Sequence, residues 1–417
     1  MHGRLLRLVA FSFALGAGTT SVVHAADAAV RVTFDRRGIV QIEAAGQADR
    51  ATARRATGDD PVRIASISKL VVAIGVLRLV EQGRLDLDAD VGRWLGHELR
   101  NPNFPTVPIT LRLLLSHRSG LTDRAGYVIP YDAALRDTLR QPSAWDAEHA
   151  PGQYFRYANL NLPVVAAVLE GATRERFDRL MRRLVLAPLH LDACFNWQGC
   201  SPAARKRAVV LYDAGTAVVD GANQNCPVVR GTDGSCDLER WRAGRNGAMF
   251  SPQGGLRISA RDLARIGRLL LGEGVVDGVR LLRPASFHAL VHPEWVFDGR
   301  NGLRGEEDTD GDANSGIFCR YGLALQTLAT PVRGCADDPR GDGRALIGHA
   351  GSAYGLLSGL WVDRRAGTGI AYFVTGAGQA PGNRSQFTAI EEQMLAGEPL
   401  EVLIDATNAR ATSTVAP

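Results

Sequence analysis

Apolar residues cover nearly every face of the segment 66–82. They are Ile67, Leu70, Val71, Val72, Ile74, Val76, Leu77, Leu79 and Val80. A surface helix would keep a polar face, so this pattern predicts a helix that is buried on all sides. Gly83 follows and is suited to end it, because glycine adopts the left-handed conformation common at helix C-termini.

Strand patterns lie near the two ends of the chain. Residues 29–49 contain two alternating runs that meet at Arg37-Gly38, and residues 358–376 contain two more that meet at 365–367. Each pair predicts an antiparallel hairpin. Helix-like spacing of apolar residues occupies the regions between them, most clearly in 109–117, 162–189, 257–274 and 384–397.

These patterns predict an α+β fold in which one antiparallel sheet is closed by both termini and flanked by helices, with a mostly helical lobe inserted. We assign about 26–83 and 252–400 to the sheet part and about 84–251 to the lobe. The lobe includes an irregular insertion, 193–248, that is rich in Gly, Asn and Cys, and a polar tail is expected over 401–417.

The first 25 residues have the features of a cleaved secretory signal. Two basic residues, Arg4 and Arg7, precede an apolar run from Leu8 to about Gly18, and small residues follow up to Ala25. A buried N-terminal helix is the alternative. The run is too short to span a membrane, so we expect export to the periplasm or the medium and no stable membrane anchor.

Composition adds little beyond excluding some partners. The chain is 45% apolar and 22% charged, as ordinary globular proteins are, and its formal net charge is +4. Removing the signal takes away two arginines and no acid, which leaves +2. This near balance argues against nucleic acid or anionic membrane as a partner and leaves a small-molecule or peptide substrate. It does not fix the oligomeric state.

All six cysteines lie beyond the signal, and an oxidising compartment favours their pairing. Each neighbouring pair encloses a Gly-rich or polar loop. We therefore predict disulfides between Cys194 and Cys200, Cys226 and Cys236, and Cys319 and Cys335, among the fifteen pairings possible.

One of only two lysines, Lys69, lies in the sequence Ser66-Ile67-Ser68-Lys69; the other is Lys206, against 46 arginines. Lys can lose its proton when it is desolvated, whereas Arg stays charged. Ser66 and Lys69 are three residues apart on a predicted helix, so they share a face and the amine can accept the serine proton.

Two further short motifs carry candidate chemistry. Tyr157-Ala158-Asn159 precedes a predicted helix, and His349-Ala350-Gly351 precedes an apolar strand. Gly351 would let a substrate backbone approach, and the amide of Ser352 could face an oxyanion. Taken singly, each motif is also compatible with a structural role.

Together, Ser-x-x-Lys, Tyr-x-Asn and His-x-Gly in this order resemble the motifs of the serine β-lactamase and penicillin-binding-protein family, most closely its class C-like branch. The flanking sequences RIASISKLVVAIGVLRLVEQGRLDLD, ITLRLLLSHRSGLTD, YFRYANLNLPVVAAVLEG and SPQGGLRISARDLARIGRLLL are also similar. The resemblance spans about 62–362, apart from the insertion.

The resemblance implies that Ser66 is the acylating nucleophile and that Lys69 and Tyr157 handle its proton. A Tyr can act as a base near neutrality only beside a cation, because its ordinary pKa is about 10. Asn159 would hold the acyl side chain of the substrate, with His349 and Gly351 also in the binding site. The amides of Ser66 and Ser352 would form the oxyanion hole.

Many members of the family have Lys-Thr-Gly as the third motif, where this chain has His349-Ala350-Gly351. Members with His there resemble D-aminopeptidases and related amidases. A cleft-facing imidazole with a pKa of about 6.5 supplies little positive charge at pH 7. Neutral amides and esters should therefore be preferred over substrates that end in a carboxylate, and the difference should narrow as pH falls.

Competing signals are weaker. His288 and His292 are four residues apart on a predicted helix but have no adjacent acid to complete a metalloprotease motif. Residues 306–316, EEDTDGDANSG, resemble a calcium loop with Gly311 at the sixth position, but position twelve is Ile317 rather than a bidentate Glu. We expect no cofactor and no metal.

The sequence thus predicts an exported serine hydrolase that forms an acyl-enzyme on Ser66 and acts on an amide, peptide or ester. D-aminopeptidase, D-Ala-D-Ala carboxypeptidase and esterase activities remain open, as do β-lactam substrates. The rival hypothesis is a catalytically idle relative that binds cell-wall peptides. An intact Ser66 and Lys69 favour the enzyme, because a pure binder needs no titrating amine.

Overall fold

The computed structural model describes residues 26–213, 216–218, 226, 230–306, 315–376 and 378–404. Among them, nine strands form one antiparallel sheet in the order β10-β11-β12-β13-β14-β15-β1-β2-β3. Their bounds are β1 Ala28–Asp35, β2 Ile39–Asp49, β3 Arg54–Arg55, β10 Trp295–Val296, β11 Arg320–Tyr321, β12 Gln326–Leu328, β13 Leu346–Ala353, β14 Leu356–Asp363 and β15 Thr368–Thr375.

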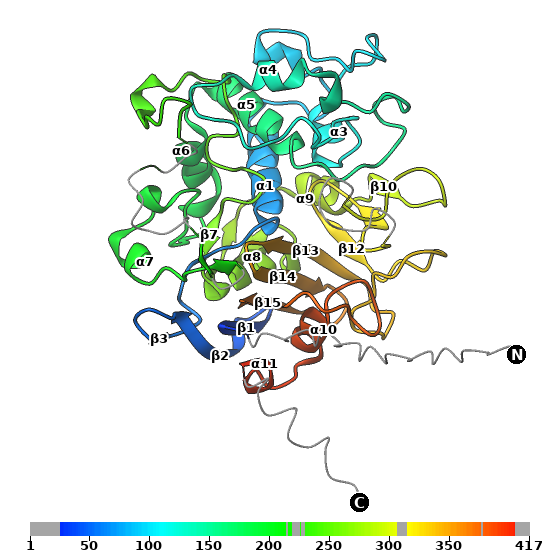
Figure 1. Ribbon diagram of the computed structural model, residues 1–417. Coiled ribbons are helices and arrows are strands. Elements are labelled where there is room, and N and C mark those ends of the chain that lie inside the picture. The colour runs from blue at the N-terminus through cyan, green and yellow to red at the C-terminus, as the bar shows by residue number, and fades with distance from the viewer. Residues whose placement is uncertain are drawn as a thin grey trace, which may run out of the picture.

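The two predicted hairpins are β1-β2 and β14-β15, and they lie side by side in the sheet (Figure 1). β1 pairs with β15 along its whole length, from Ala28 opposite Thr375 to Asp35 opposite Thr368. The two ends of the described chain therefore close the sheet, and the predicted α+β fold is confirmed.

Helices cover both faces of this sheet. On one face α8 (Ala260–Leu271) lies against β1, β14 and β15, and the buried helix α1 (Ile67–Glu81) contacts β13 and β14. On the other face α10 (Ala389–Ala396) contacts β14, and α11 (Glu401–Ile404) contacts β1 and β2 (Figure 1). The sheet is thus the middle layer, with an apolar core on each side.

The helical lobe surrounds the far end of α1. Its helices are α2 Gly92–Leu95, α3 Leu111–Leu115, α4 Leu135–Leu139, α5 Asn161–Thr173, α6 Phe177–Met181 and α7 Pro202–Lys206, with α9 Pro284–Val291 also against α1. Short two-stranded ladders join β4 (Val62–Arg63) to β7 (Arg257–Ile258), β5 (Tyr212–Asp213) to β6 (Thr216–Ala217), and β8 (Val275–Val276) to β9 (Val279–Arg280).

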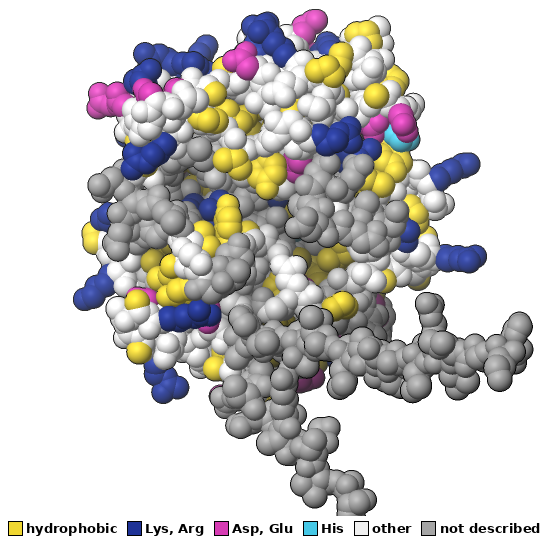
Figure 2. All heavy atoms as spheres, in the orientation of Figure 1, with side chains coloured by type: hydrophobic (Ala, Val, Ile, Leu, Met, Phe, Trp, Pro, Cys, Tyr) yellow, Lys and Arg dark blue, Asp and Glu magenta, His cyan; other side chains and the backbone are white. Residues whose placement is uncertain are grey.

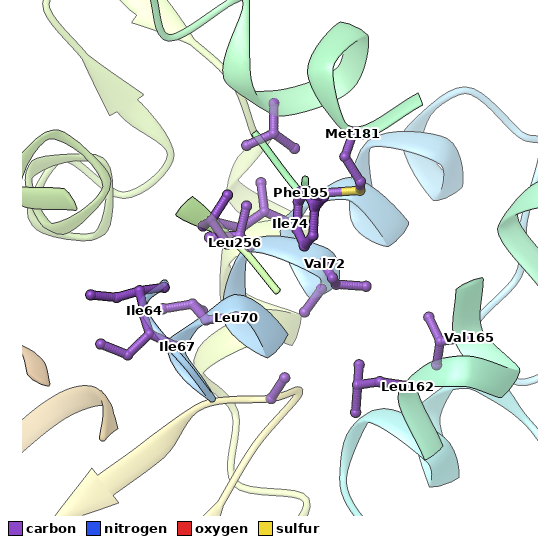
Figure 3. Packing of buried hydrophobic residues seen from close by; sticks show 14 of the residues in the cluster. Ile64, Ile67, Leu70, Val72, Ile74, Leu162, Val165, Met181, Phe195 and Leu256 are labelled. Atoms are coloured by element: carbon purple, nitrogen blue, oxygen red, sulfur yellow. The ribbon is translucent and has the colours of Figure 1, made fainter. Parts of the chain in front are cut away.

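Packing around α1 explains its uniformly apolar sequence. Figure 3 shows residues of α1 between Leu162 and Val165 of α5 on one side and Met181 and Phe195 on another. Gly75 lies against Met181, and a Cβ there would lie 2.8 Å from its sulfur, so the Met side chain would have to shift. A helix enclosed in this way is held rigidly.

Several boundaries differ from the sequence-based prediction. The run 162–189 is interrupted, because Arg174 ends α5 in the left-handed conformation with φ 59° before α6 begins. The helix expected over 384–397 begins at Ala389, since Thr388 and Glu391 form a capping box that fixes its start. The first four residues of the expected tail form α11; residues 1–25 and 405–417 lie outside the described residues.

The three predicted disulfides are confirmed. Cys194 pairs with Cys200, Cys226 with Cys236 and Cys319 with Cys335, with Cα–Cα distances of 5.1, 5.7 and 5.9 Å. Each bridge closes a loop of the kind that made the pairing plausible.

On the face shown in Figure 2, Lys and Arg side chains stand apart from one another around the edge. Hydrophobic side chains lie nearer the middle, so positive charge on the visible part of this face is dispersed. Within the described ranges, no helix combines the length and hydrophobicity needed to cross a bilayer.

Candidate active site

Ser66 lies at the N-terminal end of α1, directly after an unusual turn. Ala65 has a φ of 51°, in the left-handed region that few residues with a Cβ adopt. The hydroxyl of Ser68 holds this turn, because it donates to Ala65 O at 2.6 Å and accepts from the amide of Leu256 at 3.0 Å. The turn places Ser66 at the edge of a pocket, where its side chain lines the wall.

Lys69 is fully buried, with 0% of its surface exposed, one turn along α1 from Ser66. Its Nζ donates to Ser66 Oγ at 2.9 Å, Asn159 Oδ1 at 2.8 Å and Gln253 O at 2.9 Å. Burial lowers the pKa of this amine to about 7, against an opposing effect of Glu306 and Asp123. Near neutrality the neutral amine can keep two hydrogens for Asn159 and Gln253 and offer its lone pair to Ser66.

Asn159 is oriented by a partly buried carboxylate that the sequence analysis did not single out. Asp123 accepts from Asn159 Nδ2 at 2.9 Å and from the amides of Asn159 and Leu160, each at 2.8 Å. Because a carboxylate only accepts and an ammonium only donates, the Asn159 amide must turn its nitrogen to Asp123 and its oxygen to Lys69. Asp123 therefore fixes one of the three partners of Lys69.

Tyr157 lies between two aromatic rings beside this cluster. His117 stacks on it at 4.4 Å and Phe318 at 4.6 Å between ring centroids, and Lys69 Nζ is 4.9 Å from its ring centre. Burial raises the pKa of the Tyr157 hydroxyl well above 10, although the nearby Ser66 hydroxyl lowers it. Tyr157 is thus a protonated phenol in this structure.

His117 is buried in the same stack. Its Nδ1 accepts from the amide of Ala158 at 3.1 Å, so its hydrogen is on Nε2. Burial lowers the pKa of His117 well below 6.5, and the charge of Lys69 adds to this effect. A neutral ring supports Tyr157 without adding a second cation beside Lys69.

His349 lies inside strand β13 rather than before a strand, and only 1% of it is exposed. Its Nδ1 is 2.5 Å from Ala350 O, which can only accept, so Nδ1 carries the hydrogen. Its Nε2 then accepts from the hydroxyl of Tyr321 at 2.8 Å. Burial lowers the pKa of His349 to about 3, with Lys69 contributing.

This environment corrects one expectation. With a pKa of about 3, His349 stays neutral from pH 5 to 8. Lowering the pH within this range should therefore not reduce the preference for neutral substrates over carboxylates by protonating His349. Both ring nitrogens are also used within the protein. The ring lines the pocket, but its hydrogen-bonding groups are already occupied.

Gly351 allows β13 to approach the start of α1. A Cβ at this position would lie 2.5 Å from Ser358 Oγ, 2.6 Å from Ile64 O and 3.1 Å from Ser66 N. The sequence analysis expected the missing side chain to admit a substrate backbone. In the structure, the close neighbour is the chain's own backbone before Ser66.

The amide of Ser352 faces the open edge of β13. β12 pairs with β13 only as far as Gly348, and beyond that point the amide of Ala350 reaches Gln326 Oε1 at 3.3 Å. Successive amides of a strand point to opposite edges, so the amide of Ser352 points the same way as that of Ala350. Ser66 and Ser352 line the same pocket.

The pocket has a volume of about 480 Å³. It is lined by Ser66, Tyr157, Glu306, Ser315, Ile317, Phe318, Gln326, His349, Ala350, Gly351, Ser352, Leu357, Gln379, Gln386, Thr388 and Glu391. The structure therefore brings Ser66, Tyr157 and the His349 motif together around one space of a size that suits a small ligand. Lys69, which is bonded to Ser66 and Asn159, is not part of this lining, and neither is Asn159.

One wall is an aromatic cluster anchored by a disulfide. Its buried members are Phe155, Tyr157, Trp295, Phe297, Phe318, Cys319 and Tyr321. Phe155 stacks on Trp295 at 4.0 Å between ring centroids. Cys319, which follows Phe318, forms a disulfide with Cys335. The rings that hold Tyr157 and His349 in place are thus joined to each other.

Asp123, His117 and Tyr321 are site residues that the sequence analysis missed. Asp123 and His117 lie in the quoted segment ITLRLLLSHRSGLTD, where an acid and a His beside an apolar run were the available signal. Tyr321 has no comparable signal, because its partner His349 is 28 residues away.

A family model described as Beta-lactamase matches residues 22–395 of this chain. The chain belongs to the Beta-lactamase family. The matched segment contains all three motifs and every strand of the large sheet.

Among known relatives, this Beta-lactamase family member is 32% identical to Esterase EstB of Burkholderia gladioli over 258 residues, which are 57% of this chain and 64% of EstB. It is 26% identical to Protein flp of Staphylococcus aureus strain N315 over 196 residues, 43% of this chain and 37% of that protein. The chain thus spans less than two thirds of the length of these relatives.

Solved structures share the fold at low identity. The octameric penicillin-binding protein homologue from Pyrococcus abyssi has a TM-score of 0.61 and 18% identity, covering 90% of this Beta-lactamase family chain and 75% of its own. D-amino acid amidase from Ochrobactrum anthropi SV3, complexed with D-phenylalanine, has a TM-score of 0.60 and 19% identity, covering 92% and 95%.

The competing sites of the sequence analysis stand apart from this pocket or cannot be described. The rings of His288 and His292 stack at 5.7 Å at the end of α9. Residues 307–314 of the calcium-like loop lie outside the described residues. In the part of the chain that the structure describes, no three His, Cys, Asp or Glu side chains form a group that could hold a metal ion.

Proposed function

We propose that this protein is a serine hydrolase that forms an acyl-enzyme on Ser66 and passes the acyl group to water. The observation that carries the proposal is the buried amine of Lys69, 2.9 Å from Ser66 Oγ and with a pKa of about 7. A base works best when its pKa is near the working pH, because it is then often neutral and still basic. Lys69 would take the proton of Ser66 as the hydroxyl attacks.

Tyr157 has a different part in this proposal than the resemblance alone implied. Its pKa is raised, so it is not the base that starts the reaction in the free enzyme. It is suited to donate a proton to the leaving group. It can then be reprotonated by Ser66 or Lys69, which lie beside it.

The oxyanion would lie between the amides of Ser66 and Ser352. Ser66 N is at the start of α1, where helix amides are free and the local potential is positive. The amide of Ser352 is directed to the open edge of β13, and Gly351 keeps this edge close to Ser66. Two amides converging on one point stabilise a developing negative charge.

We propose a neutral amide or ester as the substrate. EstB is named an esterase, and the Ochrobactrum structure is named a D-amino acid amidase. The uncharged His349 supports the same choice, because it gives a terminal carboxylate no positive partner. Carboxypeptidase and β-lactam substrates are secondary candidates.

The idle binder remains the rival function. A protein that only binds its ligand has no use for an amine with a lowered pKa, whereas burying Lys69 lowers the stability of the fold. The buried Lys69 therefore favours the enzyme over the idle binder. Export is also part of our proposal. The signal-like residues 1–25 and the three disulfides support it.

A panel of substrates would test the function. The purified protein and Ser66→Ala would be given a short-chain ester, D-amino-acid amides, a D-Ala-D-Ala peptide and a cephalosporin. We expect the ester and an amide to be cleaved fastest, and only by the protein with Ser66. Equal rates for both proteins on every substrate would favour the idle binder.

A further inference from the structure

The wall of the pocket that is formed by the chain leading into α10 is polar and acidic. Gln386, Thr388 and Glu391 line the pocket from this segment. Glu306 and Glu391 are the charged residues among the described lining, since His349 is neutral, and both are acids. The ionisable carboxyl groups of the described lining are therefore not accompanied by a basic side chain.

Glu391 is buried, with 4% of its surface exposed, and its two oxygens differ. Oε2 accepts from the amide and the hydroxyl of Thr388, each at 2.9 Å. Within the described ranges, Oε1 makes no hydrogen bond, although the residue lines the pocket. Because Glu391 lines the pocket and the protein supplies no donor to Oε1 in the described ranges, a ligand can donate to this oxygen without displacing a protein group.

The groups around Glu391 do not meet this need. Glu392 accepts from the amides of Asn383, Arg384 and Ser385 on another side. Burial raises the pKa of Glu391 to about 7, the hydrogen bonds from Thr388 lower it, and the charge of Glu392 raises it. Tyr372 lies near enough for Glu391 to raise the pKa of its hydroxyl. An ammonium group placed against Oε1 would favour the ionised carboxylate and pair with it.

Two further polar side chains of the lining, Gln326 and His349, are already engaged. Gln326 donates to Ile317 O at 3.2 Å and accepts from the amide of Ala350 at 3.3 Å. Both nitrogens of His349 are bonded within the protein. Glu391 Oε1 is thus an acceptor that a ligand can use without breaking an existing bond, and among Gln386, Thr388 and Glu391 it is the one that belongs to a carboxylate.

We propose that Glu391 binds a positively charged N–H group on the leaving part of the substrate, so that the preferred substrates are esters or amides of amino alcohols or diamines. This inference rests on the proposed function. The leaving part is chosen because Asn159, to which the resemblance assigns the acyl side chain, is partly exposed outside the lining of this pocket. The α10 wall is then left for the other half of the substrate.

A matched pair of esters tests the inference. Dimethylaminoethyl butyrate and isopentyl butyrate have the same shape, but only the first carries an ammonium at pH 7. A third ester, the isopentyl ester of γ-aminobutyrate, moves the ammonium to the acyl part. The measured quantity is kcat/KM for each ester, corrected with Ser66→Ala for spontaneous hydrolysis.

Glu391→Gln is the informative variant, because Gln can still complete the capping box at the start of α10 while the charge is lost. Glu398→Gln is the matched control, since Glu398 follows the same helix and does not line the pocket. The melting temperature of each variant would show that the fold is kept.

We expect the wild-type protein and Glu398→Gln to prefer dimethylaminoethyl butyrate over isopentyl butyrate by about tenfold, as one charge-assisted contact allows. The preference should fall to about one in Glu391→Gln. An unchanged preference in Glu391→Gln, or a preference only for the γ-aminobutyrate ester, would overturn the inference.

A second measurement needs no turnover. Isopentylamine should slow the labelling of Ser66 by a fluorophosphonate in the wild-type protein and much less in Glu391→Gln, whereas isopentanol should not distinguish the two. Equal protection of both proteins by the amine would defeat the inference alone. No labelling of Ser66 under any condition would defeat the proposed function, and the inference with it.

Discussion

Replacing Asp123 by Asn should shift the pH dependence of Ser66 acylation to lower pH. The carboxylate of Asp123 raises the pKa of Lys69, and Asn159 connects the two through bonds of 2.9 and 2.8 Å. In the proposed mechanism acylation needs Lys69 neutral, so its rate should rise as pH passes the pKa of about 7. Without the negative charge at 123, that pKa falls and the rise occurs at lower pH.

The size of the shift follows from the geometry. An amide separates its oxygen and nitrogen by about 2.3 Å, so Lys69 Nζ and Asp123 Oδ2 are at most about 8 Å apart by this path. Unit charges at that distance interact by about 2 kcal/mol at an effective dielectric constant of about 20, or about 1.5 pH units. Burial raises the pKa of Asp123 itself, so it is only partly ionised at acid pH and we expect about one unit.

The assay is the rate of fluorophosphonate labelling of Ser66 between pH 5 and 9. Asp137→Asn is the control, because this exposed side chain on α4 loses the same charge far from Lys69. Asp123→Asn should also lower the free energy of unfolding by about 2 kcal/mol, since one oxygen replaces two that accept three hydrogen bonds. A labelling profile that superimposes on that of the wild type would refute the electrostatic link.

Three further variants test other parts of the site. Between pH 7 and 9 the free energy of unfolding of the wild type should rise by about 1.4 kcal/mol per pH unit relative to that of Lys69→Met. The reason is that the pKa of Lys69 is about 7 in the folded protein and 10.5 in the unfolded chain, so in this range the unfolded chain binds one more proton. If denaturant titrations gave a difference between the two proteins that did not change with pH, Lys69 would not be desolvated. Gly351→Ala should lower the free energy of unfolding by about 1–3 kcal/mol and the rate of Ser66 labelling by about a hundredfold or more. Gly38→Ala, with open space at its Cβ, should change neither quantity. Replacing Cys319 and Cys335 together by Ser should lower kcat/KM even at temperatures at which the whole protein stays folded, because the bridge adjoins the rings that hold Tyr157. Full activity with a lowered melting temperature would mean that the bridge contributes to stability alone.

Local sequence patterns were enough for the elements that carry their own periodicity. The buried helix α1 and the hairpins β1-β2 and β14-β15 are each specified by the alternation or spacing of their own apolar residues. Strands β10 to β12 are two or three residues long, too short to show a period, and they are fixed by their neighbours in the sheet. They could not be predicted from local pattern.

The candidate site divides in the same way. Ser66 and Lys69 could be singled out because they are close in sequence and because a lysine is rare in this chain. The neutral state of His349 could not, because it depends on burial and on Tyr321, which another strand supplies. The role of Asp123 likewise depends on a fold that brings it to Asn159 from 36 residues away.

The most direct test of the account is the covalent labelling of Ser66 in the wild type and in Lys69→Arg, followed by intact-protein and peptide mass spectrometry across pH. We predict one adduct, on Ser66, formed at a rate that is half-maximal near pH 7 in the wild type. Lys69→Arg should keep its fold but label at less than about a hundredth of that rate, because guanidinium cannot accept the proton. An adduct on another residue, or a rate in Lys69→Arg above that threshold, would contradict the claim that Lys69 activates Ser66.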